Sequence, residues 1–80
     1  MPDKVIAYID GGSRGNPGPA AAGFILTDPA GARLQAGAVF LGRATNNTAE
    51  YTAIVKALEA AKRIGAEELT VFSDSELLVK

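Results

Sequence analysis

Cysteine and histidine are both absent from this chain of 80 residues. Without cysteine, the chain can form neither a disulfide framework nor a metal site with thiolate ligands. Without histidine, a serine–histidine catalytic triad is excluded, and so are most zinc sites. Any acid–base or metal chemistry therefore has to use carboxylates, of which the sequence contains nine.

Long apolar runs and a strong net charge are also missing. No apolar stretch approaches the roughly 20 residues that a membrane-spanning helix needs, and residues 1–4 lack the charged-then-apolar pattern of a secretory signal. We therefore expect a cytoplasmic protein with no membrane partner. The net charge of −1 provides no general attraction to a polyanion, so any affinity for nucleic acid has to be local.

Hydrophobic patterning predicts one small α/β domain over residues 1–80. Short apolar runs separated by turn residues predict three strands in an antiparallel meander, at residues 4–10, about 20–27 and about 33–41. Residues 11–19 and 42–47 are expected to be loops. Apolar residues then recur at helical spacing over roughly 48–64, which predicts a crossover helix.

The end of the chain predicts a fourth strand at residues 68–73 and the start of a second helix at Glu76, capped by Ser75. The first and fourth strands are apolar on both faces, as expected for buried strands. Since one complete helix covers only one face of a sheet, either part of the protein is missing or a second copy covers the other face. We therefore expect a truncated domain, with a homodimer as its favoured oligomeric state.

Three acidic residues are placed at ends of these predicted elements. Asp10 ends the first strand, Glu50 is in the first turn of the helix, and Asp74 ends the fourth strand. If the two strands are parallel neighbours, their carboxyl ends meet at one edge of the sheet, where the helix start can bring Glu50. Converging carboxylates repel each other, and a magnesium ion, which prefers oxygen ligands, would relieve the repulsion. Two such ions could support phosphodiester cleavage.

Taken one at a time, these features have ordinary structural explanations. An aspartate at a strand end often serves in a turn, and a glutamate in the first helical turn favours the helix dipole. The glycine-rich segment 11–19 is not a dinucleotide-binding turn, because its glycines are differently spaced and a strand follows instead of a helix. A simple surface hairpin loop remains the alternative for this segment. Only the three acidic residues taken together favour a functional site.

Three motifs resemble those of prokaryotic type 1 ribonucleases H. They are YIDGGSRGNPG at residues 8–18, TNNTAEY at residues 45–51 and FSDS at residues 72–75, in that family's order and spacing. The resemblance covers the whole chain and implies a truncated ribonuclease H-like fold. It also implies Asp10, Glu50 and Asp74 as catalytic ligands of Mg²⁺, with Mn²⁺ as a substitute, and an RNA–DNA hybrid as the substrate.

The resemblance further implies which residues contact the RNA strand. These are the backbone at Gly11 and Gly12 and the side chains of Asn16, Asn46 and Asn47. A ribose 2′-hydroxyl both donates and accepts a hydrogen bond, and an amide side chain can satisfy both roles. For the asparagines alone, loop and capping roles remain the alternative.

Several parts of the family's pattern are not found in these 80 residues. Family members continue with a fifth strand, further helices and a fourth acidic ligand, and many carry a basic helix and loop and a histidine. Glu76 also replaces an amide side chain. We therefore expect a weak or impaired endonuclease for the RNA strand of hybrids. An inactive fragment that folds by homodimerisation, and a nuclease of the same fold acting on another nucleic acid such as DNA junctions, are the alternatives.

Overall fold

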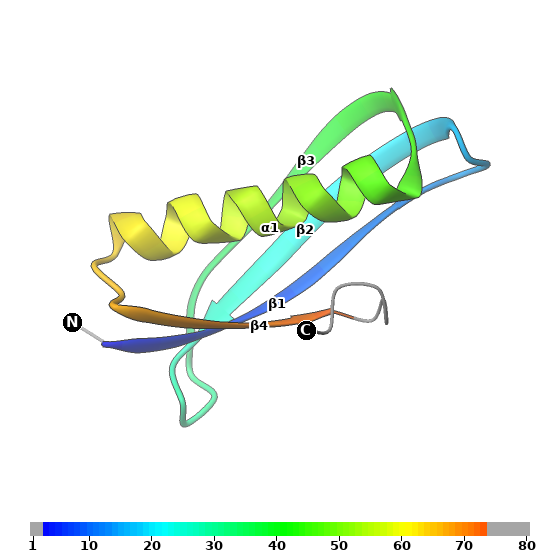
Figure 1. Ribbon diagram of the computed structural model, residues 1–80. Coiled ribbons are helices and arrows are strands. Elements are labelled where there is room, and N and C mark those ends of the chain that lie inside the picture. Colours follow the sequence, from blue (N-terminus) through cyan, green and yellow to red (C-terminus); the bar gives the residue numbers. More distant parts are fainter. Residues whose placement is uncertain (1–2, 74–80) are drawn as a thin grey trace.

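Four strands and one helix make up residues 3–73, the part of the chain that this computed structural model describes. In chain order they are β1 (Lys4–Ser13), β2 (Gly18–Thr27), β3 (Arg33–Ala44), α1 (Asn46–Arg63) and β4 (Glu68–Ser73). The strands form one mixed sheet in the order β3-β2-β1-β4 (Figure 1). β2 is antiparallel to both β1 and β3, and β4 is parallel to β1. The predicted meander, crossover helix and parallel fourth strand are therefore confirmed.

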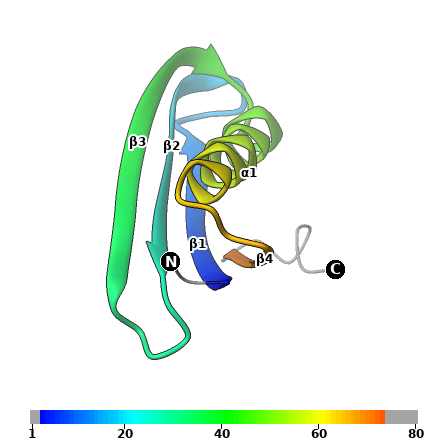
Figure 2. The ribbon, with the colours of Figure 1, turned by 90° about the vertical axis from the view of Figure 1, so that its left-hand side faces the viewer.

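α1 lies across one face of this sheet, as Figure 2 shows. The buried side chains of the helix are all alanines, at positions Ala49, Ala53, Ala57, Ala60 and Ala61. Larger apolar side chains on the facing side of the sheet, including Val5, Ile9 and Leu26, complete the core. The helix is thus held against the sheet by a stripe of small residues at helical spacing. Among residues 3–73, no helix is both long and apolar enough to cross a membrane.

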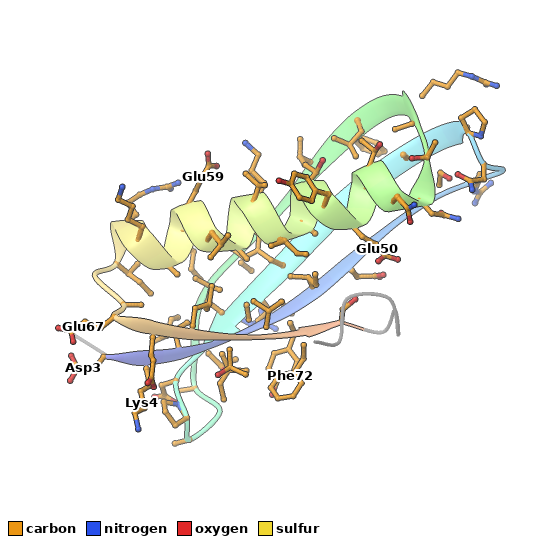
Figure 3. The ribbon with its side chains drawn as sticks, viewed as in Figure 1. Asp3, Lys4, Glu50, Glu59, Glu67 and Phe72 are labelled. Atoms are coloured by element: carbon orange, nitrogen blue, oxygen red, sulfur yellow. The ribbon has the colours of Figure 1, made fainter. Side chains whose placement is uncertain are left out.

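The opposite face of the sheet is not covered by another described element (Figure 2). Tyr8 and Phe72 are neighbours there on paired strands, each about half exposed, with their rings stacked at a centroid distance of 5.7 Å. Figure 3 shows Phe72 pointing away from α1. The prediction that a single helix covers only one face is therefore confirmed for residues 3–73.

The helix begins two residues earlier than the apolar period predicts. Thr45 is the N-cap, and its hydroxyl accepts a hydrogen bond of 3.1 Å from the backbone N–H of Thr48. Asn46 and Asn47 are therefore the first two helical residues instead of part of a loop. The apolar period misses this boundary because the capping hydroxyl, and no apolar side chain, sets it.

β1 and β3 are both longer than the sequence predicts. β1 continues past Asp10 through Gly11 and Gly12 to Ser13, because its antiparallel pairing with β2 continues to the Ser13–Ala20 pair. Glycine is a weak strand former, so cross-strand pairing and not local preference extends the strand. The predicted second helix starting at Glu76 lies outside the described residues.

Candidate active site at the junction of β1 and α1

β1 and the first turns of α1 come into direct contact at Gly11. A Cβ atom placed on Gly11 would lie 2.5 Å from the carbonyl oxygen of Ala49 and 2.7 Å from the backbone nitrogen of Glu50. Both distances are too short for any side chain, so only glycine fits. Asp10 directly precedes this point, and Glu50 extends from α1 on the side of the sheet (Figure 3). The contact thus brings the backbone of β1 next to Asp10 close to the backbone of α1 at Glu50.

Asp10 is not at the end of its strand, contrary to the prediction. It lies inside β1, three residues before the end of the strand at Ser13. On the β4 side, however, the described pairing ends at Ile9, which is opposite Ser73. Asp10 is therefore the first residue of β1 beyond the described part of β4. The predicted third acid, Asp74, follows Ser73 in the sequence and lies outside the described residues.

Glu50 is not in the first turn of the helix, which contains no acidic residue. Because α1 begins at Asn46, Glu50 is its fifth residue, and the prediction of a first-turn position is wrong. The favourable effect of the helix dipole on an anion falls off within the first turn. An interaction with the helix dipole therefore explains the position of this half-buried glutamate less well than a first-turn position would have allowed.

The carboxylates of Asp10 and Glu50 lack basic partners in the described part of the chain. The ion pair found there, between Lys56 and Glu59 at 3.6 Å, is on an exposed part of α1. Asp10 is exposed and Glu50 half-buried, and neither carboxylate forms a hydrogen bond with residues 3–73. Two carboxylates without neutralising partners are a donor set that fits a hard divalent cation. Residues 3–73 hold no group of three potential metal ligands.

Three asparagines predicted to contact substrate lie where the β1–β2 loop meets the start of α1. The side-chain oxygen of Asn46 accepts hydrogen bonds from the backbone nitrogen of Ser13 at 2.8 Å and from its hydroxyl at 3.1 Å. The side-chain oxygen of Asn16 accepts a bond of 3.0 Å from the backbone nitrogen of Asn46. The side chain of Asn47 forms no hydrogen bond with a described residue. All three side chains are at least partly accessible to solvent.

Ser13 is a site residue that the sequence did not single out. Its backbone and hydroxyl both donate to Asn46, 33 positions away. Ser13 lies within the YIDGGSRGNPG motif, and this is the one feature of the sequence that could have identified it as a site residue. In a glycine-rich segment, however, a serine is equally typical of a turn, so its role depends on contacts that are distant in sequence.

Gly12 is the second glycine predicted to contact substrate, and it differs from Gly11. A Cβ atom on Gly12 would lie 3.6 Å from the side-chain oxygen of Asn46, an ordinary van der Waals distance. Gly12 therefore lies close to the side chain of Asn46 without a steric conflict.

A groove of about 900 Å³ lies on the uncovered face of the sheet. Its lining includes Asp10, Tyr8 and Phe72.

Comparisons with known proteins show similarity in both sequence and fold. The sequence model of the RNase H family matches residues 2–80. Ribonuclease HI of Halobacterium salinarum is 49% identical over 77 residues, which is 96% of this chain and 39% of that protein. The chain therefore spans well under two thirds of the length of this relative.

Solved structures show the same fold. LC11-RNase H1 in complex with an RNA/DNA hybrid has a TM-score of 0.87 and 44% identity, over 94% of this chain and 57% of that chain. The N-terminal RNase H domain of a Mycobacterium tuberculosis protein, fused to maltose-binding protein, has a TM-score of 0.90 and 44% identity, over 95% of this chain and 55% of that chain. Because the family model matches nearly the whole chain and these solved structures share both its fold and 44% of its sequence, the chain belongs to the RNase H family.

Proposed function

We propose that this chain carries part of a metal-dependent endonuclease site that hydrolyses the RNA strand of RNA–DNA hybrids. The observation that supports the proposal is the close approach of Gly11 to the backbone of Ala49 and Glu50, which brings β1 next to Asp10 against α1 at Glu50. Membership of the RNase H family supports it. So does the close structural likeness to a relative whose solved complex contains an RNA/DNA hybrid.

In this proposal Asp10 and Glu50 hold the metal, and Asp74, outside the described residues, is the third ligand. Mg²⁺ is the proposed ion and Mn²⁺ a substitute, since both accept carboxylate oxygens. When bound, the ion would place positive charge against the phosphate and activate a water molecule for in-line attack. The protein would contribute the close strand–helix packing at Gly11, which sets the backbone positions from which the two carboxylates extend.

The asparagines and glycines beside this junction are the proposed contacts with the RNA strand. Side-chain N–H groups of Asn16, Asn46 and Asn47 are free of described partners and can donate to sugar, base or phosphate oxygens. Gly11 and Gly12 would offer backbone atoms, because neither has a side chain that shields the strand. Together these groups orient the strand next to Asp10.

Cleavage of labelled nucleic acids tests the proposal directly. The chain should cut the RNA strand of an RNA–DNA hybrid when Mg²⁺ or Mn²⁺ is present, and should leave DNA duplex and RNA duplex of the same sequence intact. We expect a low rate, since the chain spans only 39% to 57% of the relatives compared above. Cleavage that continues in excess chelator would contradict the proposed metal dependence. Preferred cleavage of branched DNA would favour a nuclease with another substrate.

The uncovered sheet face supports a second candidate, an inactive chain that folds by homodimerisation. Tyr8 and Phe72 leave about half of each ring exposed there, and a second copy could bury them, because a twofold axis brings the same face of both copies together. Sedimentation equilibrium at about 10 μM should then show a dimer that Phe72→Ser dissociates. Tyr51→Ser is the matched control, since Tyr51 is an exposed aromatic residue on α1. A monomeric, cooperatively folded wild type would contradict this candidate.

A further inference from the structure

The outer edge of β3 is a long strand edge that lacks the usual protection against pairing. In the order β3-β2-β1-β4, β3 is an end strand, and it has 12 residues, whereas β4 at the other end of the described sheet has 6. Backbone groups along an open edge can pair with another strand, and proteins often block this with lysine or proline. Residues 34–42 contain no proline and no charged residue. Figure 2 shows this edge lying clear of α1.

The large exposed side chains of β3 lie on the face that α1 does not cover. Side chains alternate between the two faces along a strand, and Val39 and Leu41 pack against the core on the side of α1. Phe40 lies between them in sequence, so its ring points away from α1, and it is 89% exposed. Leu34 is 38% exposed and does not pack against the described core. A partner strand along this edge would bury both side chains.

A twofold axis at Gly37 makes this segment complementary to itself. In an antiparallel pair with such an axis, residues equally far before and after Gly37 face each other. Phe40 of one copy is then opposite Leu34 of the other, and Ala36 is opposite Ala38. Directly opposite side chains lie on the same face of a sheet, where they contact each other. The pairing therefore joins the large apolar side chains at both ends and leaves small ones at the centre.

The two neighbouring registers fit less well. An axis at Ala38 places Arg33 opposite Arg43, and like charges directly opposite each other are destabilising. An axis at Ala36 moves Phe40 past the end of the partner's strand, because β3 starts at Arg33. A slip by a single residue is excluded, since it would oppose side chains from different faces. The self-complementary register is thus also the one that keeps the arginines apart.

We propose that two copies of this chain pair through the outer edges of β3, antiparallel about a twofold axis at Gly37, so that their sheets become one continuous sheet. Because each chain has one β3 edge, this pairing closes as a dimer. The surface is distinct from the sheet face at Tyr8 and Phe72. The inference is also independent of the proposed function, because β2 separates β3 from β1 and its carboxylate.

Two double variants with charges at the centre of the segment test both the pairing and its register. Ala36→Lys with Ala38→Lys opposes lysine to lysine twice across the axis, whereas Ala36→Lys with Ala38→Glu opposes lysine to glutamate twice. Both positions are exposed, so both variants should fold, which thermal melting by circular dichroism checks. Sedimentation equilibrium of the wild type should give a dimer with a micromolar Kd. The lysine–lysine variant should raise this Kd about 10-fold or more, and the lysine–glutamate variant should dimerise at least as tightly as the wild type.

Phe40→Ser is a second, milder test, because it removes the apolar contact with Leu34 without adding charge. It should also weaken the dimer. Phe72→Ser is the matched control, since it removes a half-exposed phenylalanine from a strand that is not at this edge, and it should leave the dimer intact.

Four results would contradict the proposal. A wild type that stays monomeric throughout the micromolar range would overturn it, and so would a lysine–lysine variant that dimerises like the wild type. Dissociation of a folded lysine–glutamate variant would exclude the axis at Gly37, because axes at Ala36 or Ala38 bring like charges together in that variant. A dimer that Phe72→Ser dissociates and Phe40→Ser does not would place the interface on the sheet face instead of the edge.

Discussion

Replacing Asp10 with asparagine is expected to lower Mg²⁺-dependent cleavage of an RNA–DNA hybrid by at least about 100-fold. Loss of a metal contact removes several kcal/mol of transition-state stabilisation, and each ~1.4 kcal/mol corresponds to a factor of ten in rate. Asparagine has nearly the same shape as aspartate but no charge. Any loss therefore reports the missing carboxylate and not altered packing. The measurement is the single-turnover rate on a hybrid whose RNA strand is labelled, at saturating metal.

The Asp10→Asn variant is expected to fold like the wild type, so misfolding should not account for a lost activity. Asp10 is exposed and its carboxylate has no hydrogen-bond or ion-pair partner within residues 3–73. Removing its charge also reduces repulsion near Glu50, so we expect Asp10→Asn to melt at the wild-type temperature or slightly above it. Binding of Mn²⁺, followed by water proton relaxation, should weaken in parallel with activity.

Asp28→Asn is the matched control for the loss of one carboxylate. Asp28 is in the turn between β2 and β3, where its side-chain oxygen accepts a bond of 2.9 Å from the nitrogen of Ala32. Asparagine keeps an oxygen that can accept this bond. The control therefore changes net charge equally and should cleave and bind metal like the wild type. Equal rates for Asp10→Asn and Asp28→Asn would refute the assignment of Asp10 as a ligand.

Gly11→Ala is expected to reduce both stability and activity, because a methyl group at this position has no room. It would lie 2.5 Å from the backbone oxygen of Ala49 and 2.7 Å from the backbone nitrogen of Glu50. Overpacking typically costs about 1–3 kcal/mol, and a cost near the upper end is expected because backbone atoms cannot rotate away. A domain of this size has little stability to lose. Urea unfolding followed by circular dichroism measures the change.

The same substitution should also move the two carboxylates apart. Relief of the clash requires the start of α1 to shift away from β1, and Glu50 would move with it while Asp10 stays on the strand. Misplacement of catalytic groups by about 1 Å can cost roughly 100-fold in rate. The cleavage rate per folded molecule should therefore fall, beyond the effect of fewer folded molecules. An unchanged rate would show that the junction does not set the geometry of the site.

Gly12→Ala is the control, one residue further along the same strand. Neither Gly11 nor Gly12 has a positive φ angle, so alanine is permitted by the backbone at both positions. A Cβ on Gly12 meets only the side-chain oxygen of Asn46, at 3.6 Å. We expect a change in unfolding free energy within about 0.5 kcal/mol. If both variants lose stability equally, strand propensity and not the helix contact would be the cause.

Local patterns in the sequence were enough to predict the order of the elements. Turn residues and alternating apolar positions indicated the meander, and the fourth strand was predicted with its observed bounds at residues 68–73. The apolar period located α1 to within two residues. These features depend on side chains close in sequence, which is why they can be read without a structure.

The sequence by itself also determined the family and which carboxylates to consider, through three motifs in a fixed order. Tertiary structure decided how those residues meet. Pairing with β2 carries β1 past Asp10, close packing makes Gly11 indispensable, and Ser13 occupies the oxygen of Asn46. Each of these depends on contacts between residues that are not neighbours in sequence, with separations as large as 33 positions. Local propensity carries no information about such contacts, because their geometry exists only after the helix has packed on the sheet.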